Sequence, residues 1–113
     1  MAKASPYETG ELTDSIFLIL LTVVNPIHGY RIMHEIKEMT QNTMVIGPAT
    51  MYTTLKKMKA ADWITEIAEE EGKILYQITP KGREILLRDY EKRKRIMEVA
   101  NERMEIGNEG TAK

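Results

Sequence analysis

Apolar residues in the first quarter of the chain recur every three or four positions, which is the spacing of an amphipathic helix. The first predicted helix begins at Thr13, whose hydroxyl can cap it, and ends at Asn25-Pro26. Its apolar positions are Leu12, Ile16, Ile19, Leu20, Val23 and Val24. The longest apolar run, residues 16–24, is about half of what a membrane-spanning helix needs, so we interpret it as a buried helix.

Two further helices follow after short connections. The second is predicted to start at His28-Gly29-Tyr30 and to stop near Gln41-Asn42. The third opens at Gly47-Pro48, because proline fits the first helical position without losing a hydrogen bond. The apolar stripes are Ile32, Ile36 and Met39 in the second helix, and Met51, Leu55 and Met58 in the third.

The remaining chain predicts a β-hairpin and a long helix. Two strand-like segments, residues 63–68 and 73–78, flank a turn whose Gly72 permits the positive φ that hairpin turns require. Thr79-Pro80 then caps a helix that runs to about Ile106. The fold class that follows is mainly α with a small β-hairpin, a winged helix-turn-helix with a long C-terminal dimerisation helix.

A chain of 113 residues fits one compact unit. We expect a flexible N-terminal arm over residues 1–9, the winged helix-turn-helix domain over 10–79, the dimerisation helix over 80–106 and a flexible tail over 107–113. The hydrophobic share of 42% and the charged share of 29% are ordinary for a globular protein. With no cysteine and no signal-like start, the expected location is the cytoplasm, with no membrane partner.

The charges are segregated along the chain, although the net charge is only −1. Residues 48–60 carry three lysines and no acid, whereas residues 61–72 carry five acids and no base. A second basic cluster at residues 92–95 is more simply a solvated helix face. The outward side of the third helix offers short hydroxyls and lysines, which can approach base edges and phosphates closely. This pattern predicts a DNA-recognition helix.

Three short sequence motifs are more specific for a protein family than the order of elements is. The chain resembles the PadR family of bacterial transcriptional regulators over about residues 12–100. The resemblance rests on His28-Gly29-Tyr30 followed by Ile36, on residues 47–56 (GPATMYTTLK), and on residues 76–82 (YQITPKG). It implies a repressor that binds a palindromic operator in double-stranded DNA as a homodimer and, in many members, is released by a small molecule.

The same resemblance makes residues 48–59 the recognition helix and the hairpin the wing. Tyr30, Tyr52 and Lys56 match positions that approach DNA. The full set of expected DNA-binding residues is Tyr30, Thr50, Tyr52, Thr53, Thr54, Lys56, Lys57 and Lys73.

The wing departs from the family's pattern. Related wings usually carry arginine or lysine near the tip, but here the tip reads Glu69-Glu70-Glu71-Gly72-Lys73. Three carboxylates near phosphates should weaken binding. Two interpretations stay open: the tip points away from DNA, or binding is weak and salt-sensitive.

The last helix carries a stripe with alternating gaps of four and three, which is the seam of a two-stranded association. The stripe consists of Leu86, Tyr90, Arg93, Met97, Ala100 and Met104, with Arg93 interrupting the apolar series. Leu12 and Ile16 are expected to join this dimer interface. The alternative is that the helix folds back over its own domain.

Other chemistry finds little support. His28 and His34 are six residues apart, which does not place two imidazoles on one helical face, so no metal site is expected. No nucleophile stands at a meaningful spacing from a base and no glycine loop could cradle a phosphate, so we expect neither an enzyme nor a cofactor. The methionines and Trp63 are assigned to core packing rather than to a ligand pocket.

Two rival functions stay open. One is a winged-helix protein-interaction module, which the acidic wing would permit. The other is a sensor of a small aromatic or amphipathic effector with only weak DNA binding. Salt-dependent binding of duplex DNA separates the first rival from a regulator, and a thermal-shift screen tests the second.

Overall fold

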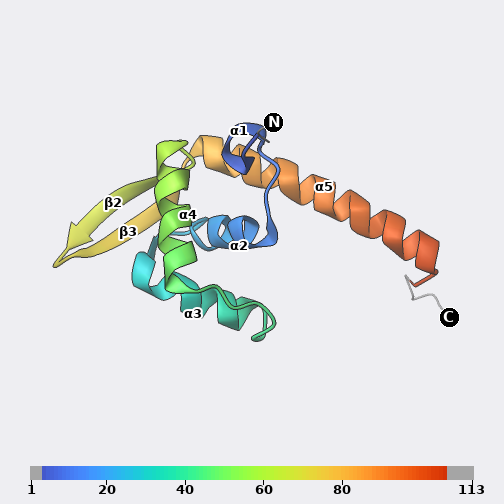
Figure 1. The fold of residues 1–113 in the computed structure, drawn as a ribbon, viewed down its shortest axis with the longest axis horizontal. Coiled ribbons are helices and arrows are strands. Elements are labelled where there is room, and N and C mark those ends of the chain that lie inside the picture. Colours follow the sequence, from blue (N-terminus) through green and yellow to red (C-terminus); the bar gives the residue numbers. More distant parts are fainter. Residues whose placement is uncertain (1–3, 107–113) are drawn as a thin grey trace.

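The computed structural model describes residues 4–106 and has the predicted fold class, a mainly helical winged helix-turn-helix with a long C-terminal helix. In chain order, the elements are α1 (Pro6–Thr9), α2 (Asp14–Thr22), β1 (Ile27–His28), α3 (Gly29–Met39), α4 (Pro48–Ala60), β2 (Ile64–Glu70), β3 (Lys73–Ile78) and α5 (Pro80–Met104). The β2–β3 hairpin and α5 project from opposite sides of the helical body (Figure 1). Across this part of the chain, no helix combines the length and the apolar character that crossing a bilayer requires.

The helix starts that the sequence predicts are confirmed. The Thr13 hydroxyl accepts a hydrogen bond from the Ile16 amide at 3.2 Å, and the Thr79 hydroxyl accepts one from the Gly82 amide at 3.0 Å. Pro48 occupies the first turn of α4. Each cap satisfies an amide that the helix itself leaves unpaired, so a local signal is enough to fix where the helix begins.

The sheet has one strand more than the sequence predicts. Its order is β1-β3-β2, all antiparallel, with Ile27 of β1 opposite Tyr76 of β3. A strand of two residues is too short to show alternation, so the pattern could not reveal β1. The hairpin turn is also tighter than expected, because Glu71 (φ 52°) and Gly72 (φ 78°) form a two-residue turn with both φ values positive.

The core is formed by the apolar faces of α2, α3 and α4 together with Trp63, which is only 1% exposed. The assignment of Trp63 to packing is therefore confirmed. Met39 is an exception among the predicted apolar stripes, since it lies exposed near the end of α3.

The first turn of α5 is pressed against the chain at Trp63. A Cβ atom added at Gly82 would lie 2.0 Å from the carbonyl oxygen of Trp63. The Thr79 amide donates to that same carbonyl at 2.9 Å, and the Thr79 hydroxyl donates to the carbonyl of Asp62 at 2.6 Å. Only glycine permits so close an approach of the helix to another stretch of backbone.

The N-terminal segment corrects the expectation of a loose arm. Residues 6–9 form α1, in which the Tyr7 ring lies 5.1 Å from the ring of Trp63. Pro6 suits the first helical turn, and the Ser5 amide donates to the Glu8 carboxylate at 3.0 Å. The rest of the predicted arm, residues 1–3, and the predicted tail, residues 107–113, lie outside the described residues.

Candidate nucleic-acid interface

The outer side of α4 presents hydroxyl, phenol and ammonium groups with no carboxylate. Its exposed residues include Thr50, Tyr52, Thr53, Lys56 and Lys57, whereas Met51, Leu55 and Met58 hold the helix in the core. The helix contains no aspartate or glutamate from Pro48 to Ala60. An element anchored on one side by apolar contacts and free on the other can enter a groove without leaving its own domain.

Thr54 is a correction to the predicted set. It is 6% exposed and shares the buried stripe of α4 with Met51 and Met58. Burial raises the pKa of Tyr7, and the side chain of Thr54 opposes this rise. The hydroxyl that was expected to face DNA therefore serves the contact between α4 and α1. Helical spacing carried the warning, because position 54 lies three after one core residue and four before another.

Three expected DNA-binding residues from three separate elements meet at one place. Tyr30 at the start of α3, Tyr52 on α4 and Lys73 at the start of β3 line a cavity of about 100 Å³. The Lys73 ammonium lies 5.5 Å from the centroid of the Tyr30 ring, close enough for a cation–π contact. The ring of His28 stacks on Tyr30 with centroids 5.5 Å apart. The pairing of β1 with β3 brings these segments together.

The acidic side of the wing stays exposed. Glu69, Glu70 and Glu71 all face solvent at and beside the turn. Further down β2, a carboxylate oxygen of Glu66 lies 2.8 Å from the Lys59 ammonium of α4. This hydrogen bond and the charge of Glu66 raise the pKa of Lys59. One lysine of α4 is thus already paired with the wing, and Lys56 and Lys57 remain as the exposed cations nearest the outer side.

The predicted dimer residues divide into two groups. Leu12, Ile16 and Leu86 are buried in the core of their own subunit, so their assignment to an interface is wrong. They fill the angle between α2 and the first turns of α5, a contact that a stripe read from one helix cannot reveal. By contrast, Tyr90, Met97 and Met104 are exposed, with Met97 at 59%, and Ala100 is half-buried.

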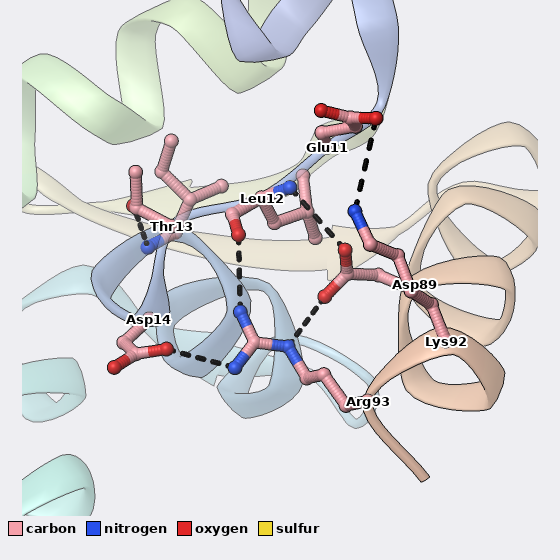
Figure 2. A network of polar contacts seen from close by, with 8 residues as sticks. Glu11, Leu12, Thr13, Asp14, Asp89, Lys92 and Arg93 are labelled. Atoms are coloured by element: carbon pink, nitrogen blue, oxygen red, sulfur yellow. Dashed lines mark hydrogen bonds and ion pairs between the residues drawn. The ribbon is translucent and has the colours of Figure 1, made fainter. Parts of the chain in front are cut away.

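Arg93, also assigned to the interface, is instead bonded within its own subunit (Figure 2). Its guanidinium donates to Asp89 at 2.5 Å, to Asp14 at 2.8 Å and to the carbonyl of Leu12 at 3.0 Å. Burial acts to lower the pKa of Arg93, but the hydrogen bonds and charges of Asp89 and Asp14 outweigh it, so the pKa is raised. The charge that interrupts the apolar stripe is thus bonded to two carboxylates of its own subunit.

Asp89 is the residue at this joint that the sequence analysis missed. It is 4% exposed and accepts a hydrogen bond from the Leu12 amide at 3.3 Å. Its spacing of four from Arg93 on one helix was a usable signal. Its hydrogen bond with Leu12, which lies 77 positions earlier, gave no signal in the sequence.

Residues 17–88 match the model of the PadR-like transcriptional regulator family. The chain belongs to this family. The match covers more than half of the chain, including α4 and the wing, and it ends one residue before Asp89.

Solved structures support the PadR-like fold. A transcriptional regulator from Clostridium thermocellum is 24% identical, with a TM-score of 0.69 and coverage of 87% of this chain and 97% of that one. A PadR family transcriptional regulator from Eggerthella lenta is 18% identical, with a TM-score of 0.62 and coverage of 83% of each chain. The RosR protein of H. salinarum is 16% identical, with a TM-score of 0.62, over 83% of this chain and 94% of its own. At these identities the likeness concerns the fold.

One curated relative was also found. An uncharacterized 37.1 kDa protein in transposon TN4556 of Streptomyces fradiae is 29% identical over 77 residues. The aligned part is 67% of this chain but only 22% of that protein, so the chain spans about a fifth of its relative. A segment similar to part of this chain therefore occurs within a much longer protein.

The matched family is one of transcriptional regulators. Within residues 4–106, no cluster of three or more histidine, cysteine, aspartate or glutamate side chains has the arrangement of a metal site. The PadR-like region instead carries an exposed, acid-free helix beside a wing, which is the arrangement that reads duplex DNA.

Proposed function

We propose that the protein is a cytoplasmic, sequence-specific repressor that binds a palindromic operator as a homodimer, with α4 as its recognition helix. The single observation that carries this proposal is the outer side of α4, where Thr50, Thr53, Lys56 and Lys57 are exposed and no carboxylate competes with phosphates. Hydroxyls and lysines at such a surface can divide the work between base edges and the DNA backbone.

The surface around the cavity supports the same orientation. Tyr30, Tyr52 and Lys73 lie on the side of the molecule where α3, α4 and the wing meet. Phenol and ammonium groups in this position can hold phosphates on either side of the groove that α4 enters. The eight expected DNA-binding residues thereby reduce to seven, because Thr54 is buried.

Selection of bound fragments from a random duplex pool tests this function directly. Two α4 helices related by a twofold axis should enrich an inverted repeat whose half-sites are about one helical turn, or 34 Å, apart. Binding should weaken steeply as salt rises, because lysine contacts release counterions. A pool that shows no enrichment, with the protein folded, would favour the protein-interaction rival.

The homodimer is proposed from the second half of α5. Apolar side chains there are left exposed by their own subunit: Tyr90, Ile96, Met97, Val99 and Met104. A helix with such a surface usually has a partner, and a second copy of the same helix offers the matching stripe.

Substitution at the centre of this stripe tests the dimer. Met97→Glu should convert a dimer into a monomer in sedimentation velocity, because it places a charge in the seam. Arg95→Gln changes the net charge by the same amount at an exposed position two residues away, and it should leave the dimer intact. A dimeric Met97→Glu variant would contradict the proposed interface.

Release by a small aromatic or amphipathic effector is proposed from the family resemblance. Its observational support is a shallow groove between α1, α2 and α4, lined in part by Tyr7, Thr53 and Lys57. A ligand seated there would lie directly beside the outer side of α4. In a thermal-shift screen of aromatic and amphipathic compounds, one that binds this groove should raise the melting temperature and also reduce operator binding. A broad panel without response counts against an effector.

A further inference from the structure

Besides the packing of Leu86 in the core, helix α5 has two polar attachments to its domain. The first is its N-terminal turn, where Gly82 touches the Trp63 carbonyl and Thr79 caps the helix. The second is the joint formed by Asp89 and Arg93 with the segment that begins α2 (Figure 2). From Gly82 to Arg93, the helix rises by about 16 Å, so the two attachments are well separated. Two separated attachments fix the direction of α5, whereas a single attachment would leave the helix free to pivot about it.

Four hydrogen bonds make up the joint. Asp89 accepts hydrogen bonds from the Leu12 amide and from Arg93. Arg93 also donates to Asp14 and to the Leu12 carbonyl. The guanidinium also lies 4.4 Å from the centroid of the Phe17 ring on α2. Its fork of donors is planar, so bonds in three directions set its orientation and not only its position.

A buried ion pair of this kind is a weak source of stability. Removing both charges from water offsets most of their attraction, and the best-attested role of such pairs is to specify one geometry among several. Asp89 is 96% buried, since its exposed fraction is 4%. Arg93 keeps only a third of its side chain accessible. The joint therefore adds directional polar bonds to the apolar packing of Leu12, Ile16 and Leu86.

The direction of α5 matters because the rest of the helix is free of its own domain. Residues 94–104 are exposed apart from the half-buried Ala100. The helix rises about 33 Å from Gly82 to Met104, so a pivot of about 10° at the first attachment would move its far end by about 6 Å. Such a displacement is close to two base-pair steps along a duplex, in which one turn of about 34 Å holds 10 base pairs.

We propose that Asp89 and Arg93 are positioning residues that set the angle between α5 and α4, and thereby the half-site spacing that the dimer accepts. The inference rests on the proposed dimer and on α4 as the recognition helix. Neither residue touches DNA in this proposal. The pair acts through the helix that joins the two subunits, so its loss should widen the range of accepted operators more than it weakens the fold.

Distances between the two α4 helices test this inference without DNA. The chain has no cysteine, so Ala60→Cys at the exposed end of α4 gives a single spin-label site on each protomer. Pulsed electron paramagnetic resonance on the dimer should give one narrow distance distribution. In the Asp89→Asn background, which keeps the shape but removes the charge, the distribution should become at least twice as wide.

Matched variants separate geometry from stability. Arg93→Lys keeps the charge but loses the planar fork, and it should widen the distribution with only a small loss of melting temperature. Glu91→Gln and Arg95→Lys make the same chemical changes at exposed positions of α5, and they should leave the distribution narrow. If Asp89→Asn does not fold, Arg93→Lys decides the outcome alone.

An operator panel gives the functional readout. With half-sites moved two base pairs closer or further apart, the unaltered dimer should bind on the order of tenfold more weakly than at the best spacing. For Arg93→Lys and Asp89→Asn, this preference should fall below about threefold.

The outcomes are distinguishable. A folded, dimeric Arg93→Lys protein with an unchanged distance distribution and spacing preference overturns the positioning role and leaves the proposed function standing. An unaltered protein with no dipolar signal overturns the dimer and the positioning role together. An unaltered dimer that binds no operator overturns the proposed function, while the distance distributions still decide whether the joint sets the angle.

Discussion

Helix α4 and the wing are in contact with each other in one domain, and they carry opposite charge. The outer side of α4 has Lys56 and Lys57 with no acid, whereas the tip of the wing has Glu69, Glu70 and Glu71 with only Lys73 beside them. In helix-turn-helix proteins, the recognition helix lies in the major groove of a duplex. The contrast teaches that a shared scaffold does not fix how much each element contributes, and that in this protein α4 should supply most of the attraction.

Removing the lysines of α4 should have the largest effect on this contrast. The double variant Lys56→Ala and Lys57→Ala should bind its operator on the order of 100-fold more weakly, with the slope of log Kd against log salt reduced by about 2. The measurement is a fluorescence-anisotropy titration at several salt concentrations. Replacing Lys94 and Arg95 on α5 by alanine removes the same charge elsewhere, and an equal loss there would show that net charge, not α4, drives binding.

Neutralising the wing tip should have a smaller effect of opposite sign. Glu70→Gln with Glu71→Gln should tighten binding by about tenfold at low salt if the tip lies near phosphates, and we expect this result. Glu98→Gln with Glu102→Gln on α5 is the control for net charge. A Kd that does not change would instead place the tip away from the duplex, the other interpretation that the sequence leaves open.

A comparison of neighbouring threonines sharpens the division of α4 itself and should have the smallest effect. Thr53→Val removes an exposed hydroxyl and should change sequence preference, with a shift in Kd of only a few fold and no change in melting temperature. Thr54→Val removes a buried hydroxyl that acts on Tyr7 and should lower the free energy of unfolding by about 1 kcal/mol. Operator binding and thermal melts of both variants decide this, and the reversed pattern would contradict the assigned faces.

The parts of the fold that depend on local chemistry were predictable from the sequence. Thr13, Pro48 and Thr79 mark helix starts because capping requires only neighbouring residues. The wing followed from Gly72 and two apolar runs. The start of α4 at Pro48 was predictable, and its role as a recognition helix stays a prediction from segregated charge and the family resemblance.

The parts that depend on long-range packing were not predictable. The short strand β1 exists only because β3 offers it an edge, and α1 exists because Tyr7 finds Trp63. Leu12 and Ile16 looked like interface residues, since nothing in a single stripe tells a core in the same subunit from a seam between two. Arg93 looked like a break in that seam, because its partners are up to 81 positions away.

The contact between Gly82 and the Trp63 carbonyl joins main chain to main chain. The Trp63 side chain takes no part in this contact, whereas the contact requires that position 82 have no Cβ atom. The two positions should therefore tolerate replacement very unequally. Another large apolar residue at position 63 would keep the backbone contact, whereas even alanine at position 82 would push the start of α5 away from residue 63. The attachment of the first turn of α5 should therefore survive apolar substitutions in the core, but it depends on the absence of a single methyl group at position 82.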